Sequence, residues 1–125
     1  MKNNRIVGNA AEEAAALWIE KNKGYSILER NYSCPAGEID IIAKDGDTTV
    51  FIEVKYRKSA ESGYPSEAVT RQKQIRIIRS AMVYVSKNDD RENIRFDVAE
   101  VMDRNGRKYI RYMENAFEWR SCPWY

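Results

Sequence analysis

Two acidic residues and a lysine occur in neighbouring segments that show the alternation of β-strands. Asp40 lies in segment 37–44, and Glu53 and Lys55 lie in segment 48–57. Magnesium prefers hard oxygen ligands, bridges to a phosphate and lowers the pKa of a bound water. A nearby lysine can hold the attacking water or the phosphate oxygens. These residues therefore predict a magnesium site for phosphodiester chemistry, with Asp40 and Glu53 as ligands and Lys55 as the catalytic cation.

Whether the two carboxylates meet depends on the turn between the segments, because side chains alternate along each strand. A two-residue loop at 45–46 sets Asp40 opposite Phe51. A four-residue loop at 45–48 sets Asp40 directly opposite Glu53, and both loops leave the acids on one face. A three-residue loop would place them on opposite faces. We therefore predict a loop with an even number of residues.

A Glu-x-Lys sequence on a strand is commonly an exposed ion pair, and this simpler explanation competes with the metal site. The flanking residues are apolar on both predicted faces: Ile39, Ile41, Val50, Ile52 and Val54 on one, and Ile42 and Phe51 on the other. Acids in such a setting repel each other and are costly to bury unless they are paired or bind a metal. The pattern thus favours the metal site.

The elements that must position these residues follow from periodicity and turn signals. They are a helix over about 6–22 ended by Gly24, strands at 25–32, 37–44 and 48–57, a loop at 58–65, a helix capped by Ser66 and running to about Lys87, and a hairpin of 94–102 and 108–114 around Asn105-Gly106. This order, αβββαββ, predicts an α/β or α+β sandwich with a central mixed sheet.

Composition limits the possible classes of protein. With 125 residues the chain is expected to form a single domain, 1–125, and no apolar stretch is long enough for a membrane helix. Histidine is absent, so catalysis must use carboxylates, lysines or hydroxyls. Cys34 and Cys122 have no metal-ligand spacing, and the N-terminus shows no export signal, which predicts a cytoplasmic protein. The net charge of +2 means that nucleic-acid binding would depend on local patches.

Asp40, a spacer of twelve residues and Glu53-Val54-Lys55 resemble the PD-(D/E)xK nuclease motif, with Ile39 in place of its proline. A wider pattern resembles the YraN family of small bacterial PD-(D/E)xK nuclease-like proteins over nearly the whole chain. Its motifs are Gly8 with Glu12 and Ala15, Gly24-Tyr25-x-Ile27-Leu28-x-Arg30-Asn31, Gly37-Glu38-Ile39-Asp40-Ile41-Ile42-Ala43, Phe51-Ile52-Glu53-Val54-Lys55-x-Arg57, Glu67-Ala68-Val69 with Lys73, and Arg95-Phe96-Asp97-Val98. Ala11 departs from the glycine usual there.

That family is similar to archaeal Holliday junction resolvases, and the resemblance implies a restriction-endonuclease-like three-layer sandwich. It also implies that a glutamate of the first helix joins the strand acids as a metal ligand: Glu12, with Glu13 as the alternative. Taken alone, Glu12 is more simply a first-turn acid favoured by the helix dipole. The implied cofactor is Mg²⁺, with Mn²⁺ as an alternative, and the implied partner is DNA, including branched DNA that a homodimer would suit.

Cationic residues near the predicted site are candidates for phosphate contacts. Lys73 and Arg76 belong to the densest cationic run of the second helix, which is explained equally well as a solvated face. Arg57 joins them through the family pattern, so the candidates for nucleic-acid binding are Arg57, Lys73 and Arg76. The cations around the second hairpin are more simply interpreted as surface residues that keep it soluble: Arg104, Arg107, Lys108 and Arg111.

The leading hypothesis is a metal-dependent nuclease acting on DNA phosphodiesters, including branched or Holliday-junction DNA. The competing hypothesis is a non-catalytic nucleic-acid-binding or protein-assembly module that keeps the nuclease fold. Replacing Asp40 and Glu53 separates the two, because a catalytic site needs both acids for magnesium whereas a binding module does not.

Overall fold

The structure is a computed structural model that describes residues 4–57, 69–88 and 93–118, with the backbone alone for residues 4–8. Its elements are α1 (Asn4–Trp18), the π-helix η1 (Ile19–Lys23), β1 (Ser26–Cys34), β2 (Gly37–Asp45), β3 (Thr48–Arg57), α2 (Arg71–Asn88), β4 (Ile94–Arg104) and β5 (Arg107–Phe117). The predicted order αβββαββ is confirmed. The predicted loop 58–65, the predicted cap Ser66 and the motif residues Glu67 and Ala68 lie outside the described residues.

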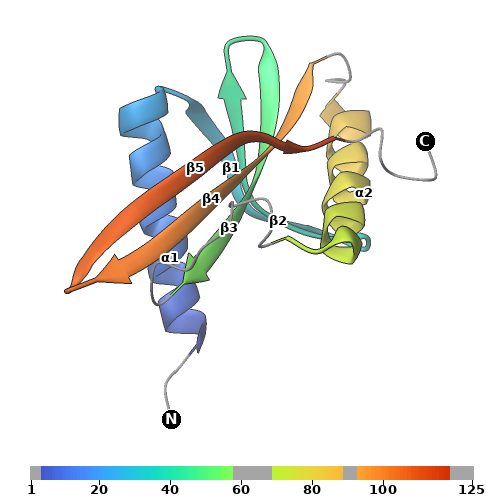
Figure 1. The fold of residues 1–125 in the computed structure, drawn as a ribbon. Helices are drawn as coiled ribbons and strands as arrows, with labels where there is room; N and C mark the ends of the chain where they lie inside the picture. Colours follow the sequence, from blue (N-terminus) through green and yellow to red (C-terminus); the bar gives the residue numbers. More distant parts are fainter. Residues whose placement is uncertain (1–3, 58–68, 89–92, 119–125) are drawn as a thin grey trace.

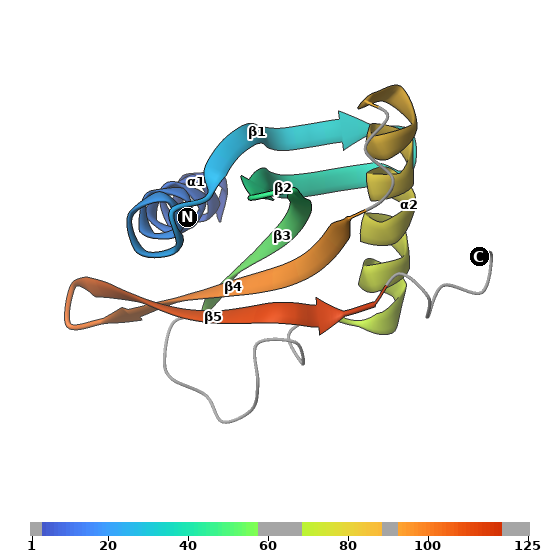
Figure 2. The ribbon, with the colours of Figure 1, turned by 90° about the horizontal axis from the view of Figure 1, so that it is seen from above.

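The five strands form one mixed sheet in the order β1-β2-β3-β4-β5. β3 and β4 are parallel, and the other neighbouring pairs are antiparallel. α1 lies on one face of the sheet and α2 on the other (Figures 1 and 2). The protein is therefore a mixed α+β three-layer sandwich of the restriction-endonuclease-like kind.

Each helix packs on its own hydrophobic core. The core under α2 includes a run of stacked rings, with Phe51 and Phe96 centroids 5.6 Å apart and Phe96 and Phe117 centroids 5.1 Å apart. The core under α1 contains the small side chains Ala11 and Ala15, both almost fully buried. Small residues at the contact let the helix axis approach the sheet closely. The residue after Ala11 is thereby held near the strands.

The helix ends combine one expected feature with one difference. Gly24 has φ +71° and donates its N–H to Ile19 O at 3.1 Å, so it is the predicted C-terminal glycine. α2 begins at Arg71, five residues beyond the predicted cap at position 66. Thr70 Oγ1 accepts the backbone N–H of Lys73 at 3.2 Å and satisfies one of the free donors of the first turn.

The two tight turns set the pairing of the antiparallel strands. Asp45 pairs with Thr48, so the loop between β2 and β3 is Gly46-Asp47, with φ +59° at Gly46. The prediction of an even loop is confirmed. The alternative loop at 45–46 is wrong, because the first loop position takes a positive φ and Gly46, not Asp45, occupies that position. The β4–β5 turn is Asn105-Gly106, with φ +53° and +79°, as its sequence predicts.

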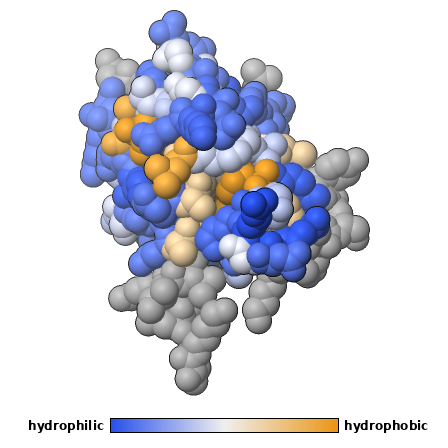
Figure 3. Space-filling view, turned by 90° about the vertical axis from the view of Figure 1, so that its left-hand side faces the viewer, coloured by the Kyte–Doolittle hydropathy of each residue, from blue (hydrophilic) through white to orange (hydrophobic). Residues whose placement is uncertain are grey.

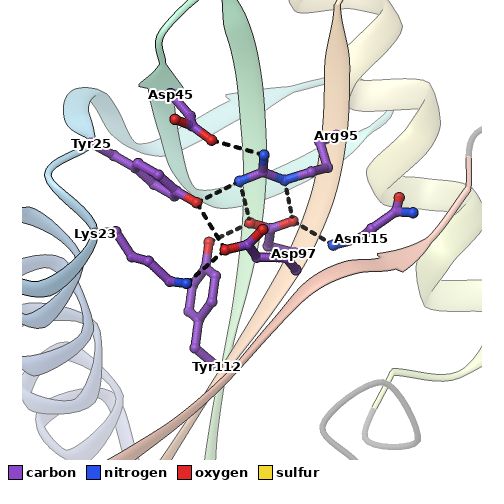
Figure 4. Close-up of polar contacts among 8 residues, drawn as sticks. Lys23, Tyr25, Asp45, Arg95, Asp97, Tyr112 and Asn115 are labelled. Carbon is purple, nitrogen blue, oxygen red and sulfur yellow. Dashed lines mark hydrogen bonds and ion pairs between the residues drawn. The ribbon is translucent and has the colours of Figure 1, made fainter.

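A buried polar network ties the first residues of β4 to its neighbours (Figure 4). Asp97 is fully buried and accepts two hydrogen bonds from the Arg95 guanidinium, at 3.0 Å each. It also accepts the Tyr112 hydroxyl at 2.5 Å and the Asn115 backbone N–H at 2.8 Å. Arg95 in turn donates to Asp45 at 2.9 Å. The network therefore joins β2, β4 and β5 at one end of the sheet.

The side of the molecule that carries α1 is mainly hydrophilic, with hydrophobic residues in small separate areas (Figure 3). Large hydrophobic side chains that remain exposed are Leu17, Leu28 and Tyr109. In the described part of the chain, no helix is both long enough and apolar enough to cross a membrane.

Replacing Asp97 with alanine should lower the free energy of unfolding by about 3–5 kcal/mol, because the partly buried Arg95 would lose its main partner and the Tyr112 hydroxyl and Asn115 N–H would lose their acceptor. Urea unfolding monitored by circular dichroism measures the change. Glu13→Ala, which breaks an exposed ion pair with Arg30, is the control and should cost less than about 1 kcal/mol. Equal losses in the two variants would contradict the role of the network.

Candidate active site

The two strand acids meet where the β2–β3 pairing ends. The ladder runs from Asp45 opposite Thr48 to Ile41 opposite Ile52, so the next position on each strand brings Asp40 opposite Glu53. Asp40 Oδ2 accepts the Val54 backbone N–H at 2.8 Å. A carboxylate thus takes the acceptor position that a strand carbonyl would fill, which is how the two strands can separate here without leaving a donor unpaired.

β2 also turns about its own axis at this point. Ile41 packs in the core under α1, whereas Ile39 packs in the core under α2. Regular alternation would put both on one face, as the sequence predicts, so that prediction is wrong for Ile39. β2 leaves the ladder with β3 at Asp40 but stays paired with β1, with Tyr32 opposite Ile39, so release from β3 on one side lets it rotate its next side chain to the other core.

The carboxyl groups of Asp40 and Glu53 are close enough for each to change the pKa of the other. Burial, followed by the charge of Asp40, raises the pKa of Glu53 to about 8. Burial also raises the pKa of Asp40, although the Val54 N–H and the Lys73 charge oppose this. Near neutral pH the pair is a protonated dyad, and two close carboxylates in a buried site have this property in general.

Two lysines are near the acid pair. Lys73, in the first turn of α2, has its Nζ 3.7 Å from Glu53 Oε2. Lys55 is exposed on β3, and its charge lowers the pKa of Glu53. Sequence patterns assigned Lys73 to nucleic-acid binding, but they did not show that it pairs with a candidate metal ligand, since this contact joins a helix and a strand that are distant in sequence.

Glu12, and not Glu13, is the glutamate of α1 that faces the strand acids. Burial and then the charge of Asp40 raise the pKa of Glu12, and Asn31 donates a hydrogen bond to it. Among the described residues, its buried Oε1 atom has no hydrogen-bond partner. Glu13 pairs instead with Arg30, Oε1 to Nη1, at 2.5 Å. Asn31 is a positioning residue for Glu12. Its φ of +55° lies in the left-handed region, which asparagine tolerates better than most residues.

The donor set fits a magnesium ion in its chemistry. Asp40 and Glu53 offer hard carboxylate oxygens. Glu12, whose Oε1 has no hydrogen-bond partner among the described residues, is close enough for the charge of Asp40 to raise its pKa. As they stand, the described residues contain no group of three or more His, Cys, Asp or Glu side chains close enough to hold a metal ion. Metal binding would therefore displace the proton of the acid pair and draw the carboxylates together.

The remaining predicted residues lie around this site. Arg57 Nε is paired with the fully buried Glu100, which also pairs with Arg111. Arg76 is exposed on α2, and a Cβ added to Gly37 would lie 3.7 Å from the Arg76 Cβ. α2 therefore packs closely over the first residue of β2. Nucleic-acid contacts by Arg57, Lys73 and Arg76 stay predictions.

The fold and site define a mixed α+β sandwich with a buried acid pair at a break in its sheet. The chain belongs to a family whose model, described as "Uncharacterised protein family UPF0102", matches residues 11–101. It is 46% identical to a UPF0102 protein of Caldicellulosiruptor saccharolyticus, over 92% of this chain and 99% of the relative. UPF0102 proteins of Syntrophus aciditrophicus and Alkaliphilus oremlandii are 45% and 47% identical, over 94% and 91% of this chain and 93% and 99% of theirs.

Protein stability should fall as the pH rises from about 5 to 9, because the pKa of Glu53 is raised from 4.5 to about 8 on folding. Between these values the folded protein holds more protons than the unfolded chain, so raising the pH favours unfolding. Urea unfolding across this range should show a flatter profile for Glu53→Gln than for wild type. Parallel profiles would contradict a proton held at Glu53.

Proposed function

We propose that this protein is a metal-dependent nuclease of the PD-(D/E)xK type that acts on DNA phosphodiesters. The observation that carries the proposal is the pair of acids Asp40 and Glu53, opposite each other where the β2–β3 ladder ends, with Lys73 Nζ 3.7 Å from Glu53 Oε2. Sequence pattern supports it independently, since the same two acids and Lys55 match the nuclease motif and the wider pattern resembles the YraN family. Branched DNA, including Holliday junctions, is the substrate that this resemblance favours.

Asp40, Glu53 and Glu12 would hold magnesium, which supplies charge stabilisation at the phosphate and a bound water of lowered pKa. The raised pKa values of the acids mean that the site is neutralised by a proton until a cation replaces it. The proton, together with the nearby Lys73 charge, keeps the two carboxylates from repelling each other in the free protein.

The two lysines would have different roles. Lys55 is exposed, so its ammonium group can reach a phosphate oxygen or orient the attacking water. Lys73 balances the charge of Glu53 in the free protein and would be released toward the substrate when magnesium takes over that carboxylate. Arg57 and Arg76 would contact phosphates on either side of the cut.

Glu53→Ala should abolish both magnesium binding and DNA cleavage, with a loss of rate on the order of a thousandfold. Calorimetric titration with Mg²⁺ and Mn²⁺ measures the first, and labelled four-way, flapped and single-stranded DNA measure the second. Glu13→Ala is the control and should behave as wild type, because Glu13 pairs with Arg30 away from the acids.

In that experiment, loss of both activities in Glu53→Ala supports the nuclease, and the preferred DNA then identifies the substrate class. Absence of metal binding by wild type would refute the catalytic role. DNA binding that survives in the Asp40→Ala/Glu53→Ala double variant, without cleavage by wild type, would instead establish the non-catalytic binding module.

Glu12→Gln should weaken magnesium affinity by about 10- to 100-fold, because it removes one charged donor and leaves the two strand acids in place. Glu13→Gln is an adjacent control that changes the net charge equally. The measurement is the calorimetric dissociation constant at pH 9, which is above the pKa of about 8 for Glu53. Equal effects of the two changes would show that Glu12 acts through overall charge and is not a ligand.

A further inference from the structure

The outer half of the β4–β5 hairpin carries three arginines on one face, namely Arg104, Arg107 and Arg111. In this hairpin Arg104 is opposite Arg107, and Glu100 is opposite Arg111, so all four share a face. Lys55 of β3 is the register partner of Glu100, and Lys55 shares its strand face with Glu53. The face of the hairpin that bears Arg104, Arg107 and Arg111 is therefore continuous with the face that bears the acid pair.

The opposite face of the hairpin is balanced in charge. Lys108 Nζ pairs with Asp103 at 3.3 Å, and Asp103 also accepts the Tyr56 hydroxyl at 2.9 Å. These residues lie on the side of α1, because Tyr56 packs against the core under that helix. Both faces of the hairpin thus carry basic residues, but the residues on the α1 side are matched by an acid.

Arg104 and Arg107 are exposed and directly opposite each other at the tip. Like charges at directly opposed positions weaken a strand pair. Among the ion pairs of the described residues, none includes either arginine, and Arg104 lies over the Tyr109 ring at 5.8 Å. Two guanidinium groups held together without an acid favour an anion between or beside them, and phosphate geometry suits guanidinium.

A second cationic cluster connects the tip to the acid pair. The fully buried Glu100 pairs with both Arg57 and Arg111, 2.5 Å from Oε1 to the Arg111 Nη2 atom. One carboxylate that faces two guanidinium groups restricts both arginine side chains. Glu100 is thus a positioning residue for the two arginines.

We propose that this face of the β4–β5 hairpin binds the phosphate backbone of a nucleic-acid duplex several base pairs from the candidate active site. Glu53 is the register partner of Val98, and from Val98 to Arg104 the strand advances about 20 Å, at about 3.3 Å per residue. That length corresponds to about six base-pair steps of 3.4 Å. The tip extends past α1 and away from α2 in both views of the ribbon (Figures 1 and 2).

The cations form a band on one face of β3, β4 and β5 between the hairpin tip and the acid pair, and the band consists of Arg104, Arg107, Arg111, Arg57 and Lys55. A duplex along this band would present its phosphates to these cations, and the scissile phosphate would then lie at Glu53. This inference rests on the proposed function for that position of the cut, while binding by the hairpin can be measured without cleavage.

The test compares Arg107→Gln with Lys108→Gln, which are adjacent, remove the same charge and lie on opposite faces of the hairpin. Fluorescence anisotropy with a labelled DNA duplex in EDTA gives the dissociation constant at several salt concentrations. Arg107→Gln should weaken binding several-fold and reduce the slope of log affinity against log salt by about 1. Arg104→Gln/Arg107→Gln should weaken binding about tenfold or more. Lys108→Gln should change neither quantity.

Equal effects of Arg107→Gln and Lys108→Gln would overturn the proposal, because overall charge would then explain them. It would also be overturned if wild type binds no duplex, or binds anionic lipid vesicles more tightly. An RNA duplex run in parallel identifies which phosphate backbone is preferred. Urea unfolding verifies that each variant is folded.

Cleavage separates this proposal from the proposed function. If wild type cleaves DNA in Mg²⁺ and the arginine variants keep their affinity, duplex binding by the hairpin is refuted and the nuclease function stands. If binding depends on the arginines and no cleavage occurs, the nuclease function is refuted and duplex binding by the hairpin stands.

Discussion

Asp40 accepts the backbone N–H of Val54, and this hydrogen bond holds β2 and β3 together where their regular ladder has ended. It depends on the register set by the Gly46-Asp47 turn, since a shift of one residue would carry Asp40 to the other face of the sheet. Because the carboxylate substitutes for a strand carbonyl, β2 can separate from β3 and rotate without an unpaired donor. The register places Asp40 opposite Glu53, and the candidate site lies where the two strands separate.

Buried charge is treated in opposite ways at two neighbouring positions of the sheet, since Asp97 is the register partner of Ile52 and Glu53 follows Ile52 on β3. Asp97 is matched by Arg95, Tyr112 and a backbone N–H, an arrangement that stabilises the sheet. Asp40 and Glu53 face each other, and their pair keeps a proton into the neutral pH range. The hydrogen-bond acceptors of Asp97 are already occupied, so a ligand would form no additional contacts there. The protonated pair of Asp40 and Glu53, near the partnerless Glu12 oxygen, can exchange its proton for a cation.

The uneven distribution of cations over the surface explains how a chain with a net charge of +2 could bind a polyanion. Arg95, Arg30 and Lys108 are paired with acids away from the site. On the face that bears Glu53, the hairpin tip adds the exposed Arg104 and Arg107, and the ion pairs of the described residues include neither. A local excess on one face is sufficient for electrostatic attraction of phosphates.

Local sequence determined much of this protein. Strand alternation, Gly24, Asn105-Gly106 and the acid spacing are properties of neighbouring residues, so they predicted the element order, the even β2–β3 loop and the candidacy of Asp40, Glu53 and Lys55. The choice between Glu12 and Glu13, the pairing of Lys73 with Glu53 and the pairing of Arg57 with Glu100 were decided by tertiary structure alone. Each depends on how a helix or a distant strand packs on the sheet, and contacts between residues far apart in sequence leave no periodic pattern in the chain.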